Sequence, residues 1–165
     1  IYYIQLHKER RVRKWFYTEI TPYIQAYRNG HCDYHGLDKD VNVDIQPNDL
    51  WINYMKAGEY NPPHIHGGHY SFVFFLDVPK EIHEENKKFK GVHSGPGSLS
   101  FMYGQTSRPQ WSAVERTFLP SQGDFFMFPA LLYHTVSPFQ SDVTRISMSG
   151  NLDITNIDKL PKGHF

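Results

Sequence analysis

The sequence predicts a mainly β fold, a sandwich or a barrel, behind a helical N-terminal segment. Aromatic residues are abundant, with 12 Phe and 11 Tyr, and 11 Pro and 12 Gly are spread among them; this mixture favours short strands joined by turns. From about residue 44 onward, short apolar runs alternate with Gly, Pro and Ser clusters, as in sandwiches and barrels. The 165 residues suit one domain with its own core.

The N-terminal segment, about 7–29, is predicted to be helical because its apolar residues fall at roughly helical spacing. Thr21-Pro22 fits a cap followed by proline at the first helical position, and Asn29-Gly30 fits a C-terminal stop. We therefore expect a single domain over 1–165, with its helical part at about 7–29 and its barrel at about 44–153.

The strands of the barrel are expected within short runs bounded by turn residues. The first places Trp51, Asn53 and Met55 on one face and Ile52 and Tyr54 on the other. The run 70–78 is almost continuously apolar, so we expect it to be covered on both faces. The runs expected to form strands are 49–58, 70–78, 97–104, 117–120, 124–130, 134–139 and 144–152. The polar stretches 79–97 and 104–117, the second with Trp111, are expected to be surface loops.

Charge and composition exclude several classes of partner. The 17 basic and 17 acidic residues give a net charge of zero, which argues against a nucleic-acid partner or an anionic membrane surface. No run approaches the roughly 20 apolar residues of a membrane span. The lone Cys32 has no partner for an internal disulfide, which indicates a reducing, cytoplasmic location. No signal peptide is visible, but the chain begins at Ile1 rather than at a methionine, which leaves open whether further residues precede it.

Three histidines stand together in "NPPHIHGGHYSF". Pro62-Pro63 favours an extended backbone, in which His64 and His66, two residues apart, face the same way. Such a pair offers two nitrogen ligands to a metal; the alternative is two polar residues at a strand edge. His69 has the opposite parity and is expected to be a bystander, although Gly67-Gly68 could bend the chain.

A second cluster follows the apolar strand "GDFFMFP". His134 opens another strand, and Arg145, Ser147 and Ser149 share one face of the next. A buried arginine is costly unless it meets an anion, and its planar fork matches a carboxylate. The alternatives are a half-buried histidine and an arginine on a surface edge strand.

Taken together, these motifs resemble the iron(II)/2-oxoglutarate-dependent oxygenases, which have a double-stranded β-helix (jelly-roll, cupin-like) fold. More closely, the segment from about 49 to 152 is similar to a 2OG-Fe(II) oxygenase subfamily of marine bacteria and phages. The resemblance implies Fe(II) held by His64, His66 and His134. It also implies 2-oxoglutarate bound by Arg145 and Ser147, with O2 as the other co-substrate.

The sequence departs from the superfamily at His66, where the usual ligand is Asp or Glu. The nearest acidic residues, Glu59 and Asp77, lack the expected spacing. An all-histidine triad leaves both positive charges of iron(II) in place, whereas one carboxylate neutralises one of them.

The resemblance implies hydroxylation of an unidentified substrate with release of succinate and CO2. By analogy, the substrate is a peptidyl proline or another protein side chain, and the location is the cytoplasm of a bacterium or of a phage-infected host. Asn53 and Tyr54 are expected to line the pocket, with Tyr70 and Tyr103 as lesser candidates. Two alternatives remain: a cupin-type three-histidine metalloenzyme that does not use 2-oxoglutarate, and a non-catalytic jelly-roll binding module.

Overall fold

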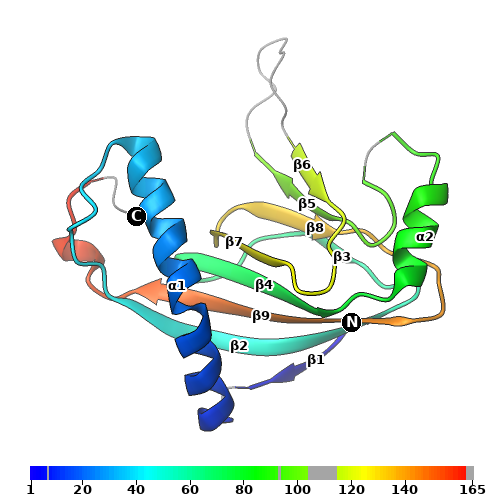
Figure 1. Cartoon of the computed structure of the whole chain (residues 1–165), viewed down its shortest axis with the longest axis horizontal. Helices are drawn as coiled ribbons and strands as arrows, with labels where there is room; N and C mark the ends of the chain where they lie inside the picture. Colours follow the sequence, from blue (N-terminus) through cyan, green and yellow to red (C-terminus); the bar gives the residue numbers. More distant parts are fainter. Residues whose placement is uncertain (7, 93, 104–114, 163–165) are drawn as a thin grey trace.

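Two antiparallel sheets face each other in the computed structural model, which describes residues 1–6, 8–92, 94–103 and 115–162 (Figure 1). The larger sheet, in spatial order, contains β1 (Tyr2–Gln5), β2 (Ile45–Lys56), β9 (Thr144–Ile154), β4 (Tyr70–Asp77) and β7 (Phe125–Pro129). The smaller sheet contains β3 (Asn61–His64), β8 (Tyr133–Val136), β5 (Leu99–Met102) and β6 (Glu115–Phe118). This arrangement is the expected double-stranded β-helix.

The apolar residues form two clusters, one on each face of the larger sheet. The inner cluster, between the sheets, includes Phe75, Phe101 and Phe128. The outer cluster packs Phe72 against Phe16 on the other face. Strand β4 therefore buries both of its faces, as its nearly continuous apolar sequence predicts.

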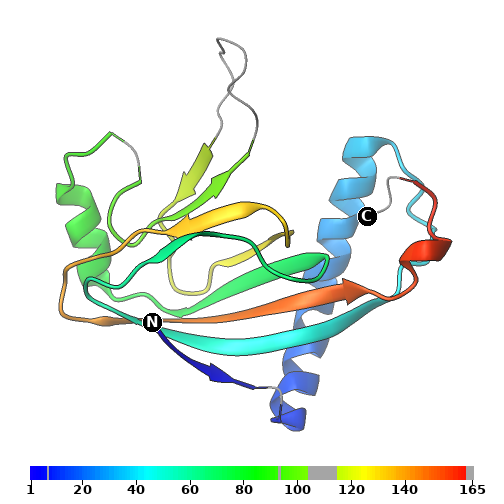
Figure 2. The ribbon, with the colours of Figure 1, turned by 180° about the vertical axis from the view of Figure 1, so that it is seen from behind.

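Helix α1 (Arg10–His35) lies across the outer face of the larger sheet at one end (Figures 1 and 2). The predicted N-terminal cap at Thr21-Pro22 is wrong, because the helix begins at Arg10 and runs through Pro22. Pro22 is exposed, and so is Thr18, whose carbonyl loses its hydrogen bond to the proline. The predicted stop at Asn29-Gly30 is also wrong: the helix ends at Gly36, whose φ of 65° gives a left-handed cap. His7 lies outside the described residues.

Helix α2 (Lys80–Lys88) occupies the first of the two stretches predicted to be loops, so that prediction is wrong. Its Ile82 is fully buried in the inner cluster, and this packing stabilises a short, highly charged helix. Glu85 accepts hydrogen bonds from the backbone N–H groups of Gln140 and Ser141, which holds the helix against the β8–β9 connection. In the second stretch, residues 104–114, with Trp111, lie outside the described part of the chain.

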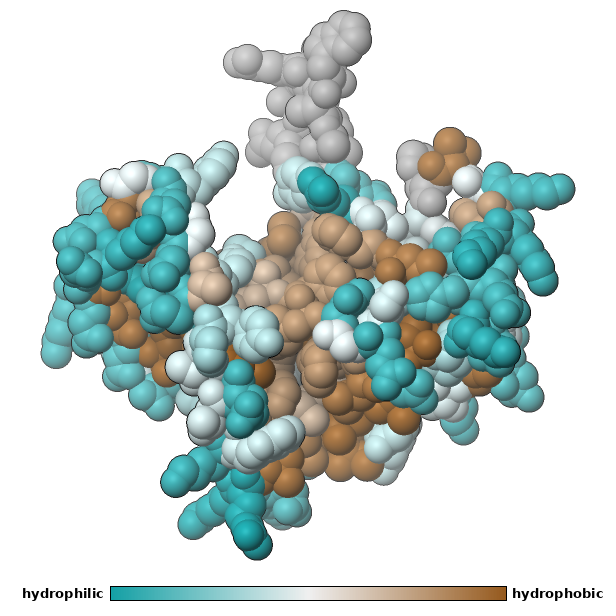
Figure 3. All heavy atoms as spheres, viewed as in Figure 1, coloured by the Kyte–Doolittle hydropathy of each residue, from teal (hydrophilic) through white to brown (hydrophobic). Residues whose placement is uncertain are grey.

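The surface shows how the helices flank the barrel. In Figure 3, apolar side chains gather at the centre of the molecule, and hydrophilic side chains cover the two ends where α1 and α2 lie. A short 3-10 helix, Ile157–Lys159, follows β9. Among the described residues, neither α-helix combines the length and apolar composition needed to cross a bilayer.

Candidate active site

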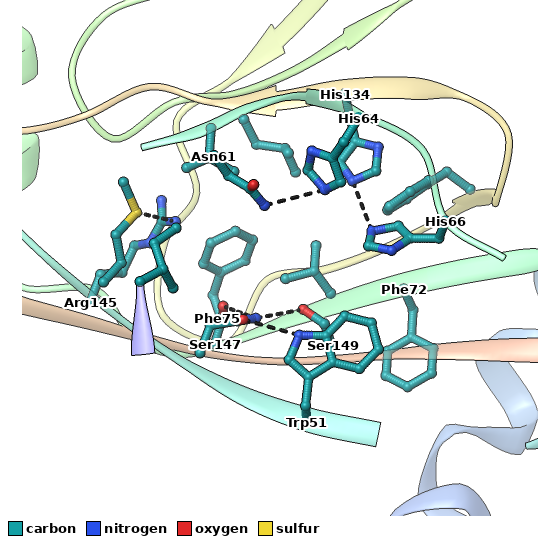
Figure 4. Close-up of a pocket in the computed structure, with 17 residues that line it drawn as sticks. Trp51, Asn61, His64, His66, Phe72, Phe75, His134, Arg145, Ser147 and Ser149 are labelled. Carbon is teal, nitrogen blue, oxygen red and sulfur yellow. Dashed lines mark hydrogen bonds between the residues drawn. The ribbon is translucent and has the colours of Figure 1, made fainter. Parts of the chain in front are cut away.

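Three histidines converge in the cavity between the two sheets (Figure 4). His64 and His134 are directly paired across β3 and β8. His66 follows β3 two residues after its end, and its backbone N–H donates to the carbonyl of Ala130 at 2.9 Å. One ring nitrogen from each histidine lies within 4.8 Å of the other two. The side chains of His64 and His66 therefore converge on one point, as the sequence predicts, and His134 is the third member of the group.

Backbone carbonyls orient two of these rings. The Nδ1 atom of His64 lies 2.7 Å from the carbonyl oxygen of Pro62, and that of His134 lies 2.9 Å from the carbonyl of Leu132. A carbonyl oxygen accepts only, so each Nδ1 carries the proton and each Nε2 carries the lone pair that can accept a hydrogen bond or bind a metal. Such a second contact fixes the tautomer and direction of a metal-ligating histidine.

Burial keeps two of the three imidazoles uncharged. Desolvation, with a smaller contribution from the nearby His64, lowers the pKa of His66 to about 4. Desolvation also lowers the pKa of His134 to about 4, against a smaller opposing effect of its hydrogen bond to Leu132. Both rings are therefore neutral at pH 7, which is the form that binds a metal.

Arg145 lies at the other side of the cavity, on β9 (Figure 4). It is 4% exposed, and its guanidinium donates to the carbonyl of Gly97 and the sulfur of Met55, each at 3.0 Å. Its Nε is buried and has no hydrogen-bond partner within the described residues. No carboxylate of the described residues lies within ion-pair range of the Arg145 guanidinium. Burial lowers the pKa of Arg145 to about 10, so the group stays cationic at neutral pH.

A polar wall joins the histidines to Arg145. Asn53 on β2 pairs with Ser147 on β9, and its side-chain amide donates to Ser149 Oγ at 3.0 Å. Trp51 Nε1 donates to Asn53 Oδ1 at 3.0 Å, and the Trp51 ring lies 5.7 Å from that of His66. The predicted alternation on β2 and β9 thus places Asn53 and Ser147 in the cavity.

Tyr54 does not line this cavity, so its assignment to the pocket is wrong. The alternation that turns Asn53 inward turns Tyr54 to the opposite face, where its ring lies 6.1 Å from Tyr2. Tyr70 belongs to the outer cluster, and Tyr103 is 43% exposed away from the histidines.

His69 and the two acidic residues lie apart from the three histidines. His69 accepts a hydrogen bond from the backbone N–H of Ile154 at Nδ1, as expected of a bystander. Glu59 accepts from the backbone N–H of Lys56, and Asp77 is exposed. No acidic side chain belongs to the group of potential ligands among the described residues.

Sequence reasoning missed two residues of the site. The Asn61 amide donates to His64 Nε2 at 3.2 Å, and Met55 contacts the Arg145 guanidinium. Met55 shares a face with Asn53, so the strand alternation could have identified it. Asn61 gives no such signal, because its position depends on the irregular pairing of β3 with β8.

Comparison with known families decides the affiliation of this chain. Residues 49–151, more than half of the sequence, match the family described as "Putative 2OG-Fe(II) oxygenase". The chain belongs to this family. The matched segment of the oxygenase contains every residue of the histidine and arginine cluster.

One solved structure supports the fold of the oxygenase, and a second is reported beside it. The non-heme alpha-ketoglutarate-dependent epimerase SnoN from nogalamycin biosynthesis shares 17% identity at a TM-score of 0.56, over 97% of this chain and 69% of SnoN. An oxidoreductase of the 2OG-Fe(II) oxygenase family from Burkholderia pseudomallei shares 15% identity at a TM-score of 0.49, over 70% of this chain and 48% of that protein. The search of curated proteins finds no match.

Proposed function

We propose that this oxygenase binds Fe(II) through His64, His66 and His134, uses 2-oxoglutarate and O2, and hydroxylates a C–H bond of its substrate. One observation carries the proposal: three imidazoles share a cavity with a buried guanidinium that has no counter-ion within the described residues. A buried, unpaired cation is unfavourable until an anion joins it. A dicarboxylate with one end at the metal and the other at Arg145 fits this arrangement.

Iron and 2-oxoglutarate, when bound, supply the oxidising chemistry, and the protein supplies position and environment. The carbonyls of Pro62 and Leu132 hold the His64 and His134 rings with their Nε2 lone pairs directed into the cavity. His66 donates from Nε2 to His134 Nε2 at 3.2 Å in this arrangement. Metal binding through Nε2 of His66 therefore requires its proton to move to Nδ1.

Arg145 is held ready for a carboxylate. Gly97 and Met55 each take one nitrogen of its guanidinium, and the ring of Phe75 lies 5.3 Å from its central carbon. These contacts fix the plane of the fork before any ligand arrives, which reduces the entropy lost on binding. Ser147 lies two residues along the same face and offers a hydroxyl donor.

A spectroscopic titration tests this function. Under anaerobic conditions, protein loaded with Fe(II) should develop the visible charge-transfer band of the metal–2-oxoglutarate chelate, and admission of O2 should then yield succinate. The Arg145→Ala variant should need a much higher 2-oxoglutarate concentration to reach the same band. Absence of the band in the parent protein, or an unchanged titration in the variant, contradicts the proposal.

The cupin-type alternative rests on one specific observation, the imidazole of His66 at the position where the superfamily usually has a carboxylate. Under that alternative the three histidines hold a metal without 2-oxoglutarate, and Arg145 binds a carboxylate of the substrate. The same titration separates the two, because the alternative predicts metal binding without the band and without succinate. The cytoplasmic location stays a prediction, supported by Cys32, which is buried and unpaired.

A further inference from the structure

We infer that the oxygenase takes a substrate with a cationic amine and that Asp49 binds this amine. The inference rests on the proposed function, because it assigns the substrate side of the same active site. It concerns an open groove next to the histidines, which is lined by Tyr3, Gln5, Asp49, Trp51, Asn53, Asn61, His64, His66 and Asn151, with Ile1 at its rim.

Strand β2 runs along the whole site, so its residues show the order in which the arginine, the histidines and Asp49 lie. Met55 contacts Arg145 at one end, and the ring of Trp51 lies beside that of His66 further along. Asp49 lies on the same wall, two residues before Trp51 in the chain and on the side of Trp51 away from Met55. Two residues of a strand span about 7 Å. The proposed metal position therefore lies between the arginine and Asp49. A co-substrate on Arg145 leaves the Asp49 end of the groove for the substrate.

The second wall of the groove comes from β1. Tyr3 and Gln5, two residues apart on this strand, pair with Asn53 and Trp51 on β2. The groove is thus a surface of the larger sheet, and its walls come from strands; Asp49 lies at an irregularity in the pairing of β2 with β9, between Pro47 and Leu50. Rigid strands suit a surface that must place a C–H bond accurately beside a metal.

The charges in the groove indicate what binds there. The described residues that line the groove contribute one carboxylate, that of Asp49, and no lysine or arginine side chain. The Ile1 ammonium, which also lines it, is paired with Glu59 at 3.0 Å. The carboxylate of Asp49 accepts a single long hydrogen bond, from Asn151 Nδ2 at 3.5 Å, and no described cation lies within ion-pair range. An aromatic indole beside an unpaired carboxylate attracts an ammonium group by cation–π and charge-assisted contacts.

Calorimetric titration with two matched probes tests this assignment. Nα-acetyl-lysine amide carries the ammonium group, and Nα-acetyl-norleucine amide has the same aliphatic chain without it. The lysine probe should bind about tenfold more tightly, which corresponds to one charge-assisted hydrogen bond. N-acetylproline amide, a neutral probe for the prolyl substrate suggested by family analogy, should bind no better than the norleucine probe.

Two variants locate the effect. Asp49→Asn keeps the shape of the side chain, removes its charge, and should abolish the preference for lysine over norleucine. Asp77→Asn removes an exposed carboxylate outside the groove and should leave the preference intact. Unchanged Fe(II) affinity in Asp49→Asn shows that the variant is folded.

The titrations are run on the full chain, both loaded anaerobically with Fe(II) and free of metal. Equal binding of the lysine and norleucine probes, binding of neither, tighter binding of the proline probe, or a preference that survives in Asp49→Asn overturns the inference. Failure of the proposed function is seen separately, as a protein that does not bind Fe(II) or 2-oxoglutarate while the metal-free groove still selects the lysine probe.

Discussion

The Nε2 atoms of His66 and His134 lie 3.2 Å apart, although 68 positions separate the residues in the chain. The contact joins the segment after β3 to strand β8. Two imidazole nitrogens bound about 2.1 Å from one metal ion, at an angle of about 100°, are themselves separated by about 3.2 Å. The spacing of these two rings therefore already suits a shared metal ion, with His64 beside them.

Removal of His134 should weaken metal binding severely. His134→Ala deletes one of three nitrogen ligands, and we expect a loss of Fe(II) affinity of roughly 100-fold or more, beyond the 10–100-fold that removal of an outer contact costs. Anaerobic equilibrium dialysis measures it. His69→Ala is the matched control, because His69 bonds to Ile154 rather than to the cluster. Equal losses in the two variants contradict the assignment of ligands.

A carboxylate at position 66 should keep the metal and change its electronic state. His66→Asp restores the ligand that the superfamily usually has, so we expect Fe(II) binding to persist, whereas His66→Ala should lose it. An anionic ligand raises the energy of the metal electrons. The charge-transfer band of the 2-oxoglutarate complex should therefore move to longer wavelength in His66→Asp. A band at the parental wavelength indicates that residue 66 does not contact the metal.

Metal affinity should respond to pH between 7.5 and about 5 with the slope of one competing proton at most. Burial lowers the pKa of His66 and His134 to about 4, so neither ring takes up a proton as the pH falls through the ordinary histidine value of 6.5. Fe(II) affinity should fall by at most about tenfold per pH unit, which corresponds to a single competing proton. Anaerobic titrations at several pH values measure this slope. A fall of about a hundredfold per unit shows that at least one of the two buried rings titrates normally.

The same shifts predict how the metal-free protein responds to acid. Both rings have a lower pKa in the folded protein than the 6.5 of an unperturbed histidine, so the unfolded chain binds protons first. Their contribution to stability is complete above pH 6.5 and is lost as the pH falls towards 4. Thermal unfolding of parent protein and His134→Ala over this range measures it, and the parent should lose more stability than the variant.

Replacement of Arg145 should separate stability from ligand binding. Arg145→Met removes a buried cation that has no counter-ion within the described residues and fills the space with an apolar chain. Exchanges of this kind are neutral or stabilising by about 1–4 kcal/mol. We expect an unchanged or higher Tm together with the loss of 2-oxoglutarate binding. Arg116→Met, at an exposed arginine near Phe118, is the control that should retain binding.

Strand alternation made much of the site predictable. Parity grouped Asn53 with Trp51 and Met55 on one face of a strand, and that face lines the cavity; it also put Ser147 on the face of Arg145. The same rule excluded His69, and it also contradicts the assignment of Tyr54 to the pocket. Predictions from the alternation of side chains succeed here because the residues belong to strands, and the buried face of a strand fixes its register.

The helices were harder to predict, since tertiary contacts override local signals. Pro22 normally ends a helix, yet α1 continues because Phe16 and Ile20 on one side of it, and further residues beyond, pack against the sheet. Helix α2 contains few apolar residues and depends on Ile82, whose partners lie in distant strands. The residues against which the two helices pack are distant in the chain, so the local sequence does not reveal them.

An anaerobic crystal structure of the protein with Fe(II) and 2-oxoglutarate tests the central claim most directly. Anomalous scattering should place iron among the ring nitrogens of His64, His66 and His134, and the distal carboxylate of 2-oxoglutarate should contact Arg145. Iron at another position, or a 2-oxoglutarate carboxylate that leaves the Arg145 guanidinium unpaired, contradicts the account.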